Sequence, residues 1–142
     1  MKTLIEYAKS FIGMAYIWGA EGVTGFDCSG LVQEVLRSVG EDPKGDQTAQ
    51  ELYRIFSKEG DKIDKCRAGA LCFYGKSLTF ITHVAFGIDD FRVVEAGGGD
   101  SSCIDLHSAA KKSAMVRIRP YNHRGDLVAM VMPEYINCKK EI

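Results

Sequence analysis

One cysteine of this chain stands where a thiol could act as a nucleophile. Cys28 lies in a glycine-rich stretch, residues 13–30, directly before an apolar stripe typical of a helix. The partial positive charge at a helix N-terminus favours a thiolate. It supplies at most about 2 kcal/mol, roughly half of what an almost fully ionised thiol at pH 7 requires. A cationic partner must supply the rest, and an imidazolium is the usual one.

His83 is the histidine best placed to be that partner. Of the three histidines, His107 and His123 lie in polar, loop-like sequence, whereas His83 opens a predicted strand. Its side chain would emerge at the edge of a sheet while the apolar residues that follow anchor the backbone. A cysteine before a helix is commonly an inert small hydrophobic residue, and a lone strand histidine is commonly structural. The two together predict a nucleophile and a general base.

Glu95 could orient the imidazole. It follows His83 by twelve residues, and Asp89 and Asp90 between them are typical of a hairpin turn. Across an antiparallel pair, residues at matched distances from the turn are neighbours, so Glu95 could accept a hydrogen bond from the ring nitrogen that faces away from Cys28. The alternative interpretation is a solvated carboxylate at a strand end. The order nucleophile, base and orienter is that of papain-like thiol hydrolases.

The rest of the sequence predicts the elements that would position these residues. Apolar residues at helical spacing predict helices over 3–12, 31–39 and 48–57, the first and third with capping boxes at Thr3/Glu6 and Thr48/Glu51. Short apolar runs predict strands over 70–74, 83–88, 92–96, 115–119 and 127–132. Helices followed by strands predict an α+β fold, with N-terminal helices packed on an antiparallel sheet of about five strands.

Composition restricts the class of protein. The length of 142 residues predicts a single domain over 1–142. A net charge of −1 disfavours a nucleic-acid partner, and no apolar run approaches the ~18 residues of a membrane span. The start lacks the apolar stretch of a secretory signal, so we expect synthesis in the cytoplasm. No oligomeric state is predicted.

The cysteines favour neither a disulfide framework nor a metal site. Their number is odd and no two form a CxxC pair, which predicts a reducing compartment and no bound metal. The five are Cys28, Cys66, Cys72, Cys103 and Cys138.

Three segments together resemble a known family. The run YIWGAEGVTGFDCSGLV at residues 16–32, THVAFGI around His83 and VVEAGGG around Glu95 are similar to the NlpC family of papain-like cell-wall cysteine endopeptidases. The resemblance covers roughly residues 4–119. It implies a papain-like fold, with Cys28 as nucleophile, His83 as general base and Glu95 as the third polar residue, and no cofactor.

The resemblance also implies roles for neighbouring residues. Tyr16 would lie near the oxyanion or the substrate backbone, and Trp18 would form a wall of the cleft. Asp27 and Ser29 would hold the free amino group of a stem peptide, although both are also typical helix-capping residues. The implied substrate is a peptidoglycan stem peptide, cut between D-glutamate and the following diamino acid through a Cys28 thioester.

Three positions depart from the family pattern. Ala20 stands where relatives usually have a second glycine after the Trp-Gly pair, and Ala70 replaces an acidic residue before the first core strand. Glu95 occupies a position that is frequently histidine. A carboxylate there would raise the pKa of His83.

Other functions fit the same scaffold. The alternatives are a non-catalytic papain-like binding or virion structural module, and a thioester-based acyltransferase in which an amine or lipid replaces water. A domain made without an export signal suits a phage lysis or tail-associated enzyme, an injected toxin or a recycling enzyme. We therefore expect delivery to the cell wall or association with a virion. A basic C-terminal stretch could face an anionic wall polymer, although a solvated face is the commoner arrangement. It comprises Lys111, Lys112, Arg117, Arg119 and Arg124.

Overall fold

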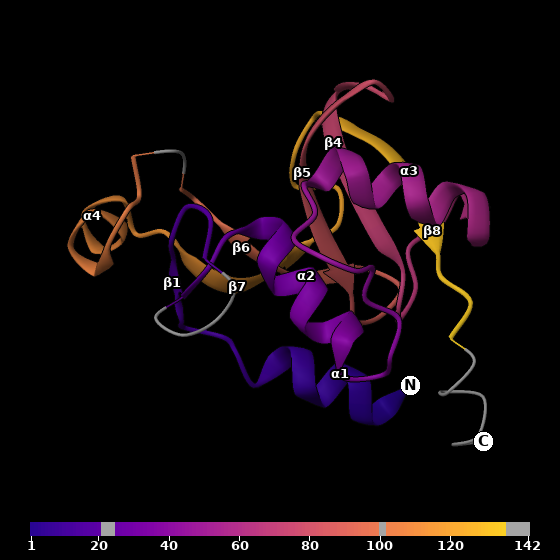
Figure 1. The fold of residues 1–142 in the computed structure, drawn as a ribbon, viewed down its shortest axis with the longest axis horizontal. Helices are drawn as coiled ribbons and strands as arrows, with labels where there is room; N and C mark the ends of the chain where they lie inside the picture. Colours follow the sequence, from indigo (N-terminus) through magenta and orange to yellow (C-terminus); the bar gives the residue numbers. More distant parts are fainter. Residues whose placement is uncertain (21–24, 100–101, 136–142) are drawn as a thin grey trace.

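The computed structural model describes residues 1–20, 25–99 and 102–135, which form four helices and one sheet of eight strands (Figure 1). The helices are α1 (Lys2–Lys9), α2 (Cys28–Arg37), α3 (Ala49–Glu59) and α4 (Leu106–Lys112). The strands are β1 (Ala15–Tyr16), β2 (Gly25–Phe26), β3 (Asp61–Ile63), β4 (Leu71–Ser77), β5 (Phe80–Gly87), β6 (Arg92–Gly97), β7 (Met115–Pro120) and β8 (Leu127–Met132).

The sheet has the predicted antiparallel character but more strands than expected. Its order is β2-β1-β7-β6-β5-β4-β8-β3, and every pair is antiparallel except β1 with β2. The five predicted strands are β4 to β8, so the α+β class is confirmed. The expected number of five is wrong because β1, β2 and β3 have only two or three residues each, too few to show a period of two.

The helices are present where the apolar spacing predicts them, with differences at their ends. The capping box of Thr48 and Glu51 at the start of α3 is confirmed. That of Thr3 and Glu6 is wrong: α1 begins at Lys2, its N-cap is Met1, and Thr3 lies inside the helix. The helix α4 was not predicted. Its N-cap Asp105 forms a capping box with Ser108, a pairing outside the usual Glu or Gln pattern.

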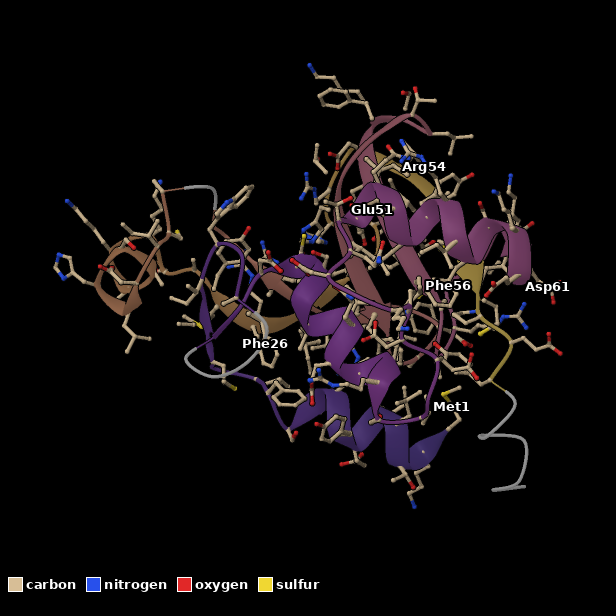
Figure 2. The ribbon with its side chains drawn as sticks, in the orientation of Figure 1. Met1, Phe26, Glu51, Arg54, Phe56 and Asp61 are labelled. Carbon is tan, nitrogen blue, oxygen red and sulfur yellow. The ribbon has the colours of Figure 1, made fainter. Side chains whose placement is uncertain are left out.

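The two faces of the sheet carry different apolar clusters. In Figure 1, α2 and α3 lie in front of the central strands, where they pack on Phe73, Val84 and Phe86. The neighbouring residues of these strands point the other way and join a smaller cluster of Cys66, Cys72, Tyr74, Ala85, Val93 and Met130. In Figure 2, Phe26 and Phe56 belong to the larger core, whereas Arg54 and Asp61 are exposed. No helix among the described residues has the length and apolarity needed to cross a bilayer.

A pair of threonine variants tests the helix assignments. Thr48→Ala removes the acceptor for the Glu51 N–H at the start of α3, so the free energy of unfolding should fall by about 1 kcal/mol in urea denaturation. Thr3→Ala is the matched control: Thr3 is exposed within α1, and alanine is a better helix former. Equal losses in the two variants would contradict the assigned N-termini.

Candidate active site

Cys28 is the first residue of α2, and its thiol lies against β5. Its Sγ is 3.9 Å from the carbonyl oxygen of Thr82, the residue before His83. The helix start is fixed by Asp27, whose carboxylate accepts hydrogen bonds from Gly30 N at 2.7 Å and Gly19 N at 3.0 Å. The backbone of Ala20 lies so close to the first turn of α2 that a Cβ on Gly30 would lie 2.3 Å from the Ala20 carbonyl oxygen. The glycine at position 30 therefore permits this close approach.

His83 and Glu95 contact each other across the hairpin of β5 and β6. The turn forms as predicted, with Asp89 accepting hydrogen bonds from the backbone N–H groups of Phe91 and Arg92. The register pairs Phe86 with Val94, so its extension makes His83 a diagonal neighbour of Glu95 rather than its direct partner. The His83 Nε2 atom contacts Glu95 Oε2.

Two expectations about His83 differ from the structure in detail. The strand β5 begins at Phe80, so His83 lies inside it and not at its start. His83 is only 6% exposed, and Glu95 is only 1% exposed. The pair is thus held within the sheet, where its mutual attraction is screened less than at a surface.

Hydrogen bonds determine the charge states of the pair. Burial lowers the pKa of His83, but its hydrogen bonds with Cys28 and Glu95 and their charges outweigh burial and raise the pKa to about 9. Burial likewise raises the pKa of Glu95, but the hydrogen bond with His83 and nearby positive charges lower it overall. Because Glu95 occupies Nε2, Nδ1 is the ring atom left for the thiol. The arrangement favours an imidazolium between a carboxylate and a sulfur atom.

The three residues line one cleft of about 600 Å³. Tyr16 and Trp18 also line it; Tyr16 is buried and Trp18 is 55% exposed. The roles of these two residues toward the substrate remain predictions. Asp27 and Ser29 do not line this cleft. The Asp27 carboxylate is engaged by the helix cap, and the Ser29 hydroxyl lies 3.4 Å from it. Their role in holding an amino group remains a prediction.

Two cleft residues that the sequence analysis did not assign to the catalytic site are close to Glu95. Arg117 pairs with Glu95 in the register of β6 and β7, and His123 Nε2 lies 3.0 Å from Glu95 Oε1. Arg117, Arg119 and Arg124 of the basic stretch all line the cleft. Arg117 could have been placed beside Glu95 only by predicting that β6 pairs with β7 in this register. No pattern marked His123, because it follows β7 in a segment without periodicity.

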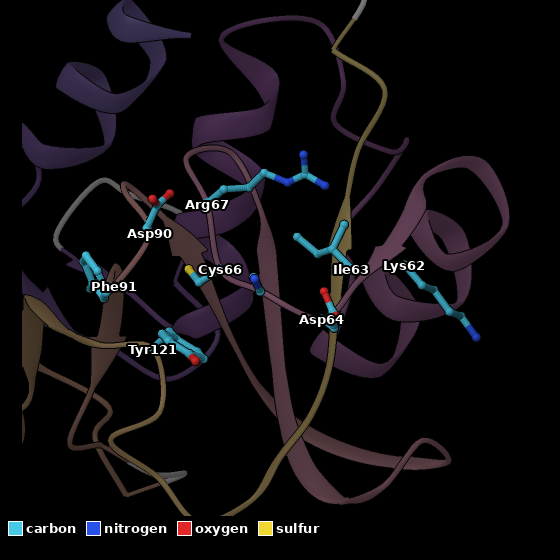
Figure 3. A pocket seen from close by; sticks show the side chains of 9 residues that line it. Lys62, Ile63, Asp64, Cys66, Arg67, Asp90, Phe91 and Tyr121 are labelled. Carbon is cyan, nitrogen blue, oxygen red and sulfur yellow. The ribbon is translucent and has the colours of Figure 1, made fainter.

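A larger cavity lies elsewhere in the molecule (Figure 3). It has a volume of about 1170 Å³ and contains none of the predicted site residues. Cys66 lines it, and the Cys66 thiol donates to the carbonyl of Asp89 at 3.4 Å. Its lining residues are Lys62, Ile63, Asp64, Lys65, Cys66, Arg67, Asp90, Phe91 and Tyr121. The chemistry of the side chains, not cavity size, therefore identifies the candidate site.

The described cysteines and acidic residues show no alternative centre. Cys28, Cys66, Cys72 and Cys103 are free thiols, and Cys138 lies outside the described residues. Within the described ranges, no three His, Cys, Asp or Glu side chains gather as ligands for a metal ion.

The sequence comparison identifies the family. The model of the NlpC/P60 family matches residues 13–120, a range that includes Cys28, His83 and Glu95. The chain belongs to this family. The papain-like α+β class predicted for it is therefore confirmed.

Two curated relatives are similar over most of this chain. The bifunctional muramidase/DL-endopeptidase CwlT of Bacillus subtilis is 31% identical over 118 residues, 81% of this chain and 35% of the relative. A gamma-D-glutamyl-L-lysine dipeptidyl-peptidase of Bacillus cereus is 30% identical over 103 residues, 70% of this chain and 29% of the relative. The chain thus spans about a third of the length of these NlpC/P60 relatives.

A solved structure shows that the same fold occurs without catalysis. RipD of Mycobacterium tuberculosis is described as a non-catalytic NlpC/p60 domain protein adapted to peptidoglycan binding. It aligns with a TM-score of 0.65 and 21% identity over 92% of this chain and 94% of that chain. Family membership alone therefore does not establish turnover.

The His83 charge state predicts a pH-dependent stability. The pKa of His83 is higher in the folded chain, about 9, than its ordinary 6.5, so its contribution is fully present below pH 6.5 and is lost as pH rises through about 9. The difference in unfolding free energy between wild type and His83→Gln should shrink by up to about 3 kcal/mol from about pH 6 to pH 9.5. Urea denaturation measures it. The exposed His107→Gln is the control and should show no such trend; a constant wild-type to His83→Gln difference would contradict the ion pair.

Proposed function

We propose that this domain is a cysteine endopeptidase that hydrolyses an amide bond of peptidoglycan stem peptides. The observation that supports the proposal is the buried contact of His83 with Glu95 in the cleft that Cys28 also lines, with the Cys28 thiol 3.9 Å from the carbonyl oxygen of the residue before His83. An imidazolium held between a buried carboxylate and a thiol keeps the sulfur as a nucleophile and carries the proton that the leaving group needs.

In the acylation step, the Cys28 thiolate attacks the carbonyl carbon of the scissile amide. The carbonyl oxygen becomes an oxyanion, which the backbone N–H of Cys28 stabilises because the first N–H groups of α2 have no acceptor within the helix. The Tyr16 hydroxyl assists from the cleft wall. His83 then gives its proton to the amide nitrogen, the C–N bond breaks, and a thioester and a free amine result.

In the deacylation step, water replaces the departed amine. Neutral His83 takes a proton from this water as its oxygen attacks the thioester carbon. The C–S bond breaks, and the sulfur leaves as a thiolate that is paired again with the protonated His83. Glu95 holds the ring through both steps and keeps its Nε2 proton in place, so Nδ1 exchanges the proton.

The proposed bond joins D-glutamate to the following diamino acid. Support comes from the names of the relatives, one a DL-endopeptidase and one a gamma-D-glutamyl-L-lysine dipeptidyl-peptidase. Trp18, which is largely exposed at the cleft, would pack on the stem peptide. Asp27 and Ser29 would act on the amino end of that peptide only if substrate reached the helix cap that they form.

A non-catalytic binding module is the second candidate function. The RipD structure supports it, because that protein has the fold without activity. Such a module would bind muropeptides and leave them intact. A thioester-based acyltransferase would instead produce the acyl group on an amine or lipid acceptor.

Purified muropeptides distinguish these functions. Incubation with wild type should produce a new carboxyl terminus on D-glutamate and a new amino terminus on the diamino acid, as identified by mass spectrometry. Cys28→Ala removes the nucleophile and should lower the rate at least about a thousandfold, whereas Cys103→Ala, at a buried thiol outside the cleft lining, should retain turnover. Bound but intact muropeptides with the wild-type protein would refute the proposed hydrolase.

A further inference from the structure

The second oxygen of the Glu95 carboxylate faces a second histidine. His83 contacts Oε2, whereas His123 Nε2 lies 3.0 Å from Oε1. Oε1 is buried and accepts no aligned hydrogen bond from any described residue. A buried carboxylate oxygen is costly unless a positive group compensates it. His123 at ion-pair distance, together with the positive charge of Arg117, supplies that compensation.

His123 is oriented by its other ring nitrogen. Its Nδ1 lies 2.8 Å from the carbonyl oxygen of Pro120, and a carbonyl can only accept, so Nδ1 carries a hydrogen. Nε2 can then donate to Glu95 only when the ring holds both protons. The side chain is 13% exposed. The ring therefore lies between two fixed acceptors in a largely enclosed place.

Tyr74 packs against both histidines. Its ring centroid is 5.3 Å from that of His83 and 6.0 Å from that of His123. Burial raises the pKa of the Tyr74 hydroxyl, which stays protonated and donates to the Tyr121 carbonyl oxygen at 2.6 Å. This hydrogen bond joins β4 to the segment that carries His123. The two imidazoles and the carboxylate are thus parts of one packed unit.

Arg124 and Asp126 fix the same segment from its other end. The Arg124 guanidinium donates two hydrogen bonds to the Asp126 carboxylate, at 2.9 and 2.8 Å. Its Cζ also lies 5.4 Å from the centroid of the Tyr74 ring. The segment between β7 and β8 therefore has few ways to move His123 away from Glu95.

We propose that His123 is a positioning residue of the active site. By holding Glu95 Oε1, it keeps Oε2 aligned with His83 Nε2 and so keeps His83 Nδ1 aimed at Cys28. His123 touches neither the thiol nor the reacting carbonyl. Its catalytic significance rests on the proposed peptidase function, whereas its effect on the His83 ring does not.

Two amide substitutions test this role. His123→Gln places an N–H donor at about the reach of Nε2, and His123→Asn carries the same amide one methylene shorter. His107→Gln, on the exposed side of α4, is the control. Thermal unfolding of each variant verifies that it is folded.

The first readout does not depend on turnover. Long-range ¹H–¹⁵N NMR of the three imidazoles should show a His83 Nε2 proton shifted far downfield by its hydrogen bond to Glu95. This signal should persist in His123→Gln and His107→Gln, and it should broaden or disappear in His123→Asn. An unchanged His83 signal in His123→Asn would overturn the proposal, even if wild type hydrolyses no muropeptide and the peptidase function fails.

The second readout is muropeptide hydrolysis. His123→Asn should lower kcat about tenfold with KM little changed, because the shorter side chain withdraws the group that lies beside Glu95 Oε1. His123→Gln should restore kcat to within about threefold of wild type, since its amide reaches the place that Nε2 occupies beside Glu95 Oε1. Equal kcat values for Asn and Gln would reduce His123 to a structural residue and overturn the proposal. Because both variants keep an amide of similar polarity, impaired folding alone would not separate them.

Discussion

The pairing of one buried carboxylate is the constraint on which this site depends. Glu95 lies in the middle of β6, almost without solvent contact, and must find positive partners inside the sheet. His83 on β5 contacts Glu95 Oε2, and His123 lies beside Glu95 Oε1. The hairpin register, the aromatic packing of Tyr74 and the segment after β7 all serve to bring these partners to the same carboxylate. What results is an imidazole whose orientation and charge are determined by the sheet.

The thiol comes from a separate part of the chain. Cys28 begins α2, and α2 packs on β5 and β6 through the larger apolar core. The position of the sulfur is therefore coupled to that of the imidazole through a packed interface, not through sequence proximity. The helix end contributes its partial positive charge, and the close approach at Gly30 holds the preceding loop against the helix. Nucleophile and base are each carried by packed elements, which limits the cost of their alignment when substrate binds.

Much of this arrangement was predictable because it depends on short-range signals. The apolar spacing after Cys28 predicted the helix, the Asp89–Asp90 turn predicted the hairpin, and the hairpin brings Glu95 to His83. The predictions are wrong where the sequence pattern is too short to identify an element, or where tertiary contacts determine the bounds of that element. Thr3 has capping-box spacing, yet α1 starts before it. Strands of two or three residues exist only through pairing with neighbours, as β1 does with β7.

His123 is the clearest case of a residue that local sequence could not reveal. It lies 28 residues beyond Glu95 in polar sequence, and only the pairing of β6 with β7 returns the chain to the cleft. The sequence favours a solvated face for the basic stretch at residues 111–124, but all three of its arginines line the cleft. The long-range pairing of β6 with β7 thus brings arginine side chains into the lining of the cleft. The sequence alone predicted only one thiol, one imidazole and one carboxylate at this site.

The rate at which iodoacetamide alkylates Cys28, measured across pH in wild type and in His83→Gln, reports whether His83 holds the thiol as an anion. We expect Cys28 to react rapidly even near pH 6, where an ordinary thiol is almost fully protonated and slow. Replacing His83 should abolish that reactivity at acid pH while leaving the alkaline rate nearly unchanged. A wild-type profile that rises only at alkaline pH and coincides with that of His83→Gln would contradict an imidazolium-paired thiolate.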